Sequence, residues 1–234
     1  MKIQIYILNL ARSAHRRTHM QNQLKSCDVP YVFIEAVDGK SKQAVDFNAY
    51  NPRTLDITGK ALKATEVGAF ISHVRAMKHA KKDGVDWAIV LEDDVVISDS
   101  FIEVVNCLPD CNNFDVVRLY TRNQTLCSGH GDVVISPRNG YSNWGGALGY
   151  AINQGGIDKV LNTYAPIHLK IDNFLFGHWI HRLNVAYTDS NMVGIENTIE
   201  SDIGYQNNDK VAKKILRRWM HDIKYKLSAF YKSL

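Results

Sequence analysis

Runs of β-branched and aromatic residues that alternate with helical patterns constrain the fold of this chain more than any other feature. The runs are "IQIYILNL" from residue 3, "YVFIEAVDGK" from residue 31 and "DWAIVLEDDVVI" from residue 86. Apolar runs of this kind are typical of strands buried in a parallel sheet. A polar helix after Ser13 and a second helix from Thr65, with apolar residues at i, i+3, i+4 and i+7, separate them. The alternation predicts an α/β domain with a mainly parallel central sheet.

Later segments extend the same pattern. A helical stretch covers residues 155–164, and five stretches have the composition of short strands: "FDVVRLY", "DVVISP", "GALGYAI", "NVAYT" and "NMVGI". Of the 234 residues 45% are hydrophobic and 22% are charged, which excludes disordered and fibrous proteins. We therefore expect one globular domain over residues 1–208.

Residues 209–234 differ from the rest of the chain in charge. They carry eight Lys or Arg and two Asp, whereas the preceding residues carry 20 basic and 22 acidic side chains. Apolar residues recur there every three or four positions, which predicts a basic amphipathic helix. Such a helix either lies in an anionic membrane interface or packs on its own domain with a solvated basic face. We expect the membrane association, and the near-neutral body argues against nucleic-acid binding.

The four cysteines and the hydropathy pattern indicate the compartment. Cys27, Cys107, Cys111 and Cys127 lack the paired spacing of a zinc site, and they are too sparse for a disulfide framework. No segment approaches the length of a membrane span. We therefore expect reduced thiols and a cytoplasmic protein that is bound peripherally to the inner face of the cytoplasmic membrane.

Three consecutive carboxylates, Glu92, Asp93 and Asp94, interrupt the third apolar run. Ligands of open α/β sheets bind beyond the carboxyl ends of the strands. Carboxylates there suit Mg²⁺ or Mn²⁺, which typically takes one or two of them together with phosphate oxygens. Along an extended chain Glu92 and Asp94 would share one face and Asp93 the other. A polar turn whose carboxylates cap loops is the alternative.

Polar side chains also follow the first two predicted strands. Asn9, Arg12 and Arg16 come directly after the first, at the edge of the sheet where the third strand also ends. Guanidinium groups beside a helix N-terminus suit a diphosphate, although an exposed basic helix face would show the same pattern. Asp38, in the turn after the second strand, could contact a ribose or a base.

The chain resembles glycosyltransferase family 25. The resemblance covers about residues 2–203 and rests on the order and spacing of six blocks, with "SDI" at 201–203 also fitting: "IYILNLARSAHRR", "FIEAVDGK", "TEVGAFISHVRAMK", "WAIVLEDDVVI", "GALGYAINQGGIDKVL" and "IDNFL". It implies a GT-A-like nucleotide-sugar-binding domain, a UDP-sugar donor (most often UDP-galactose), a divalent metal (Mn²⁺ or Mg²⁺) and inversion at the anomeric carbon. The D-x-D of GT-A enzymes appears here as Glu92-x-Asp94, which leaves open the metal ligand and how strictly a metal is needed.

The resemblance also implies roles for individual residues. It places the acidic motif at Glu92, Asp93 and Asp94, nucleotide contacts around Asn9, Arg12 and Asp38, and a functional acidic residue at Asp172, and Ser72 and His73 resemble the family's Ser-His pair. We expect the nucleotide-sugar contacts to include Arg16, Ser72, His73, Glu92, Asp93 and Gly146 as well, and the metal ligands to be Asp94 and Asp93. An inverting transfer needs a base for the acceptor hydroxyl. We expect Asp172 to supply it, with Glu196 and Asp202 as alternatives, although Asp172 could equally cap a helix. Residues 41–63 and 145–149 are candidate lids over the site.

The function expected from these features is transfer of galactose from UDP-galactose to a sugar hydroxyl of a lipooligosaccharide or lipopolysaccharide acceptor. A UDP-glucose or UDP-N-acetylhexosamine donor in the same fold is one alternative. A non-catalytic protein whose basic tail binds membrane or nucleic acid is another, which the acidic cluster, Arg12 and Asp172 argue against.

Overall fold

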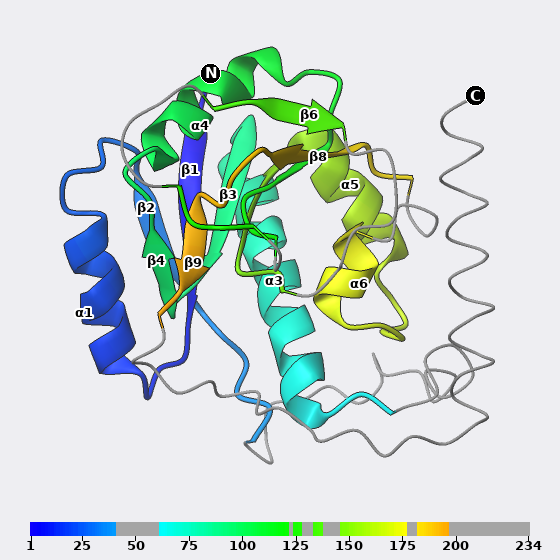
Figure 1. Ribbon diagram of the computed structural model, residues 1–234. Helices are drawn as coiled ribbons and strands as arrows, with labels where there is room; N and C mark the ends of the chain where they lie inside the picture. Colours follow the sequence, from blue (N-terminus) through cyan, green and yellow to red (C-terminus); the bar gives the residue numbers. More distant parts are fainter. Residues whose placement is uncertain (41–60, 122–123, 128–132, 138–145, 177–181, 197–234) are drawn as a thin grey trace.

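A seven-stranded mixed sheet forms the centre of the molecule. The structure is a computed structural model that describes residues 1–40, 61–121, 124–127, 133–137, 146–176 and 182–196 (Figure 1). The sheet has the order β2-β1-β3-β7-β5-β8-β6. Its strands are β1 (Ile3–Asn9), β2 (Tyr31–Glu35), β3 (Trp87–Glu92), β5 (Val116–Arg118), β6 (Ile135–Pro137), β7 (Gly149–Asn153) and β8 (Val185–Thr188).

The directions of the strands confirm the predicted fold class. Strands β1 and β2 are parallel, as are β1 and β3, and β5 and β8. Strand β7 runs antiparallel to both β3 and β5, and β6 runs antiparallel to β8. Five of the seven strands therefore point the same way, and the fold is α/β with a mainly parallel sheet.

Helices and a small second sheet cover the two faces of the central sheet. Side chains alternate along β1, so that Tyr6 and Leu8 face one core cluster and Ile5 and Ile7 face the other. The first cluster is completed by α3 (Ala64–Asp83), α5 (Gln154–Thr163) and α6 (Ile171–Phe176). The second includes residues of α1 (Ala14–Gln23), α4 (Phe101–Cys107), the 3₁₀ turn Leu108–Asp110 and the two-stranded sheet of β4 (Val95–Ile97) and β9 (Val193–Ile195).

Local capping marks both ends of α3 and the start of α5. At the start of α3 the backbone N–H of Lys63 donates to the Glu66 carboxylate at 2.8 Å, close to the start predicted at Thr65. The helix ends at Gly84, whose φ of 61° is the left-handed conformation that favours glycine. Helix α5 begins at Asn153, whose side-chain oxygen accepts from the Gly156 N–H at 2.8 Å.

The third predicted strand is not continuous, which corrects the sequence interpretation. It ends at Glu92, a turn occupies Asp93 and Asp94, and the chain leaves the central sheet to form β4, which pairs with β9. The expected alternation, with Glu92 and Asp94 on one face, therefore does not hold. Asp93 and Asp94 both turn to Arg16 instead, because its guanidinium compensates two buried carboxylates at once.

Some predicted features lie outside the described residues. They are the basic tail at 209–234, the loop at 41–60, Gly145 and Asp202. In the part of the chain that the structure describes, no helix combines the length and the apolar character that a membrane crossing requires.

Candidate functional site

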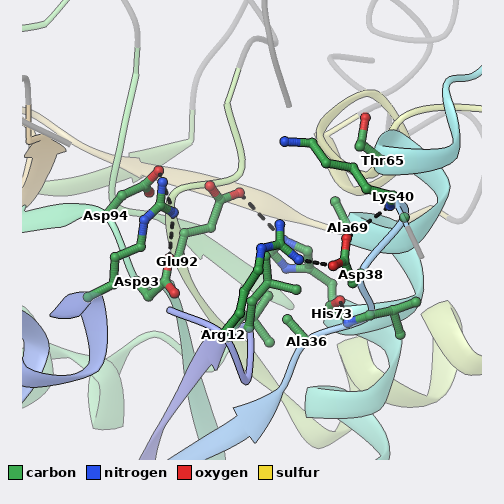
Figure 2. A pocket seen from close by; sticks show the side chains of 16 residues that line it. Arg12, Ala36, Asp38, Lys40, Thr65, Ala69, His73, Glu92, Asp93 and Asp94 are labelled. Carbon is green, nitrogen blue, oxygen red and sulfur yellow. Dashed lines mark hydrogen bonds and ion pairs between the residues drawn. The ribbon is translucent and has the colours of Figure 1, made fainter. Parts of the chain in front are cut away.

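An open pocket lies where β1, β2 and β3 end. The empty space within it is about 660 Å³ when the open solvent at its mouth is included. Strand ends supply one side of it and the first half of α3 supplies the other (Figure 2). Eight of the predicted site residues line it: Arg12, Arg16, Asp38, Ser72, His73, Glu92, Asp93 and Asp94.

Arg16 organises the acidic turn. Its Nη1 donates to Asp93 at 2.9 Å and to Asp94 at 3.3 Å, and the exposed fractions of these three side chains are 7%, 8% and 18%. Asn9 is buried and donates to the other Asp93 oxygen at 2.7 Å. Both Asp93 oxygens are thus occupied, although burial still raises the pKa of this carboxyl. Asn9 and Asp93 hold the turn in place.

Asp94 is the carboxylate best placed to bind a cation. Burial, together with the Glu92 carboxylate, raises its pKa to about 7. Its Oδ1 is buried and has no hydrogen-bond partner among the described residues. A divalent cation would satisfy this oxygen and relieve the repulsion from Glu92. The described residues contain no group of three or more His, Cys, Asp or Glu side chains suited to a metal. Asp94 alone offers a single ligand oxygen, so a divalent cation bound here would need further oxygens, such as those of a phosphate.

Arg12 and Asp38 form an ion pair across the pocket mouth, with side chains 42% and 31% exposed. The Asp38 carboxylate also accepts from the backbone N–H of Lys40 at 2.9 Å. Ser72 fixes the neighbouring backbone, because its hydroxyl accepts from the Val37 N–H at 2.8 Å and donates to the Gly68 carbonyl at 2.7 Å. Helix α3 and the exit of β2 are thereby joined beneath the pocket.

His73 links the pocket to β7. It is fully buried, and its Nδ1 lies 2.9 Å from the Tyr150 hydroxyl. Its Nε2 lies 3.7 Å from a Glu92 carboxylate oxygen, a separation too long for a hydrogen bond. Figure 2 shows Glu92 with Asp94 on one side of it and Arg12 and Asp38 on the other.

Asp172 and Gly146 are not among the residues that line the pocket. Asp172 is in the first turn of α6, and its Oδ2 accepts from the Gly146 N–H at 3.0 Å. The Gly146 carbonyl accepts from Arg118 at 3.1 Å, and the chain then reaches Leu148, whose carbonyl accepts from the Glu92 N–H at 2.9 Å. Gly146 has φ of 90°, and an added Cβ would lie 2.8 Å from the Tyr120 ring. At Gly149 an added Cβ would lie 2.8 Å from the side chain of Val193.

Arg118 and Tyr150 are residues of this region that the sequence interpretation missed. Arg118 is 1% exposed and lies 4.2 Å from the centre of the Phe176 ring, and burial lowers its pKa. An arginine inside the apolar run "FDVVRLY" was a usable signal, because buried charges are rare without a specific partner. Tyr150 gave no such signal, since a tyrosine is ordinary in a strand.

A model of glycosyltransferase family 25 (LPS biosynthesis protein) matches residues 2–175. The chain belongs to this family. That assignment confirms the resemblance described above, and the match includes the whole pocket lining as well as Asp172.

Relatives within the family carry different descriptions. A "Putative glycosyltransferase" of Haemophilus influenzae is 23% identical over 184 residues, covering 75% of this chain and 64% of that protein. Human "Procollagen galactosyltransferase 2" is 28% identical over 189 residues, covering 74% of this chain and 29% of that protein. A "Probable inactive glycosyltransferase 25 family member 3" of Rattus norvegicus is 25% identical, covering 74% and 32%. The chain thus spans about a third of the mammalian relatives.

A solved structure with a distantly similar arrangement is that of a Drosophila β1,4-galactosyltransferase 7 mutant with manganese, UDP-Gal and xylobiose. It is 13% identical, has a TM-score of 0.44, and the similarity covers 93% of this chain and 80% of that one.

Proposed function

We propose that this chain is a glycosyltransferase that moves galactose from UDP-galactose to a sugar hydroxyl of a lipid-linked oligosaccharide, with inversion at the anomeric carbon. The observation that carries the proposal is the pocket itself. It combines a buried, unsatisfied oxygen of Asp94, the accessible guanidinium of Arg12 and the His73–Glu92 pair at one sheet edge. Family membership supports the reaction class, and the procollagen galactosyltransferases support the hexose.

Each of several described residues would assist a different part of the sugar transfer, which is a single displacement. The acceptor oxygen attacks the anomeric carbon, the bond from that carbon to the phosphate oxygen breaks, and UDP departs. Arg12 is 42% exposed and can turn from Asp38 to the departing diphosphate. A Mn²⁺ or Mg²⁺ held by Asp94 would neutralise the same developing charge. We assign Asp93 to holding the turn, because its carboxylate accepts from Asn9 and Arg16 and all three residues are buried.

Asp172 is our candidate for the base that takes the acceptor proton. Its carboxylate is held at the start of α6 by the N–H groups of Gly146 and Asn173, at 3.0 and 2.7 Å. Lone pairs remain on both oxygens to accept a proton from a hydroxyl. The helix-cap alternative is weaker, because Asp172 lies within the first turn of α6 and the backbone carbonyl of Lys170 accepts from the Phe174 N–H.

A lipid-linked acceptor and peripheral attachment to the membrane rest on the charge pattern of residues 209–234. A basic amphipathic segment would keep the enzyme on an anionic surface, where the acceptor search is two-dimensional. A non-catalytic protein of the same fold is the second candidate, because several relatives are named inactive.

Transfer assays with UDP-galactose, UDP-glucose and UDP-N-acetylglucosamine, each with and without Mn²⁺, test the proposal. We expect turnover with UDP-galactose and loss of Mn²⁺ stimulation in Asp94→Asn. The control is Asp158→Asn, which removes a carboxylate from an exposed ion pair with Lys81 and should leave turnover unchanged. Asp172→Asn should lower kcat by about 10²–10⁴-fold with little change in the KM of the donor. Binding of UDP-sugars without turnover of any would favour the non-catalytic candidate.

A further inference from the structure

The contact between the imidazole ring of His73 and the hydroxyl of Tyr150 bears on which ring nitrogen of His73 carries a proton. The two rings are stacked, with centroids 5.7 Å apart, and both side chains are fully buried. Burial, with a smaller contribution from Glu92, raises the pKa of Tyr150 well above its usual value, so the phenol keeps its proton. A buried O–H requires an acceptor.

His73 Nδ1 is the acceptor that the described residues offer to this hydroxyl, at 2.9 Å. The reverse arrangement, with Nδ1–H donating to the phenol oxygen, would leave the buried phenolic proton without an acceptor there. If Nδ1 accepts, the proton of the neutral imidazole is on Nε2. Tyr150 thereby determines which nitrogen of His73 acts as a donor in the pocket.

The Nε2–H of His73 faces Glu92 without bonding to it. The nitrogen is buried and has no hydrogen-bond partner in the described part of the chain, and the nearest carboxylate oxygen is 3.7 Å away. A hydroxyl whose oxygen lies to one side of this pair, within about 3 Å of each atom, could accept from Nε2–H and donate to Glu92. A phosphate could not donate and would be repelled by the carboxylate, and an apolar group would leave Nε2–H unsatisfied. A donor and an acceptor at this spacing are suited to a hydroxyl.

We propose that His73 and Glu92 together bind one sugar hydroxyl of the nucleotide-sugar donor, and that Tyr150 is a positioning residue that holds His73 in the Nε2–H tautomer. The hydroxyl-binding role rests on the proposed function. The hydroxyl belongs to the ribose or to the transferred hexose, and nucleotides with and without the hexose distinguish the two.

The tautomer is tested by two-bond ¹H–¹⁵N NMR of the imidazole rings in the full chain, with His73 assigned by the signal lost in His73→Gln. The expected result is an Nε2–H pattern in the wild type that changes in Tyr150→Phe. Tyr6→Phe is the matched control, because Tyr6 is also a buried sheet tyrosine and its hydroxyl donates to Asp83 at 2.9 Å, away from the pocket. An Nδ1–H pattern in the wild type, or no change in Tyr150→Phe, would overturn the positioning role.

Hydroxyl binding is tested by calorimetric titration of UDP and UDP-galactose with Mn²⁺ present. His73→Asn keeps a polar group near Tyr150 but cannot reach Glu92, and it should weaken binding about tenfold. His73→Gln places an amide N–H near the Nε2 position and should stay within about threefold of the wild type. Equal weakening of UDP and UDP-galactose identifies a ribose hydroxyl, and weakening of UDP-galactose alone identifies a hexose hydroxyl.

Wild-type affinity for both nucleotides in His73→Asn would overturn the hydroxyl-binding role while leaving the proposed function intact. Failure of the wild type to bind either nucleotide would refute the proposed function and the hydroxyl-binding role together. The NMR result on Tyr150 does not depend on that outcome.

Discussion

Replacing Arg16 by Met should destabilise the protein strongly, because Arg16 compensates two buried carboxylates. Its guanidinium lies 2.9 Å from Asp93 and 3.3 Å from Asp94, and all three side chains are less than one fifth exposed. Removing one partner of a buried ion pair costs up to about 3–5 kcal/mol when the remaining charge stays desolvated. Asp93 carries most of this cost, because the pKa of Asp94 is already raised to about 7 and its carboxyl can take up a proton. For a domain of this size the melting temperature should fall by about 6–20 °C.

The assay is urea unfolding at neutral pH, without divalent ions, on four proteins: wild type, Arg16→Met, Asp93→Asn and the double variant. Removing the Asp93 charge should recover part of the loss, which would appear as a coupling energy of about 1–3 kcal/mol between the two positions. Lys81→Met is the matched control. It breaks an ion pair with Asp158 whose side chains are about half exposed, and should cost no more than about 1 kcal/mol. A loss below about 1 kcal/mol in Arg16→Met, or strictly additive effects, would refute the reasoning.

Three further predictions follow from the described geometry and the sequence. Gly146→Ala should lower the free energy of unfolding by about 1–3 kcal/mol and should also lower turnover, because φ is 90° and the Tyr120 ring lies 2.8 Å from the new Cβ. Gly84→Ala is the control, because Gly84 also has a positive φ but has open space around it. Unfolding and transfer assays of both variants should show that Gly84→Ala keeps its turnover. Deleting residues 209–234 should reduce co-sedimentation with anionic vesicles more than turnover on a soluble acceptor, and equal losses would contradict a membrane role. Iodoacetamide should alkylate Cys111 slowly, because burial raises the pKa of this thiol and the thiolate is the reactive form. Peptide mass spectrometry at several pH values should place the midpoint of its rate profile above that of free cysteine, and a midpoint at or below that of free cysteine would contradict the prediction.

The turn at Asp93 and Asp94 was only partly predictable from the sequence. The apolar run before Glu92 predicted a buried strand ending in carboxylates at the ligand edge, and β3 does end there beside β1. Period-two alternation then placed Asp94 with Glu92, which is wrong because the chain turns at Asp93. No local rule predicts that turn, since it depends on Arg16, which lies 77 residues away from Asp93 in the sequence.

The sequence by itself determined the α/β class, the strands of the sheet edge and the residue types available at that edge, because hydrophobic periodicity and the succession of strands and helices along the chain are local properties. Only the tertiary structure decided what each polar group contacts. It placed Arg16 on two carboxylates, Tyr150 on His73, and Arg118 and Asp172 on either side of Gly146. Such pairings join residues distant in sequence, and the cost of burying an unpaired polar group selects them only once the core has packed.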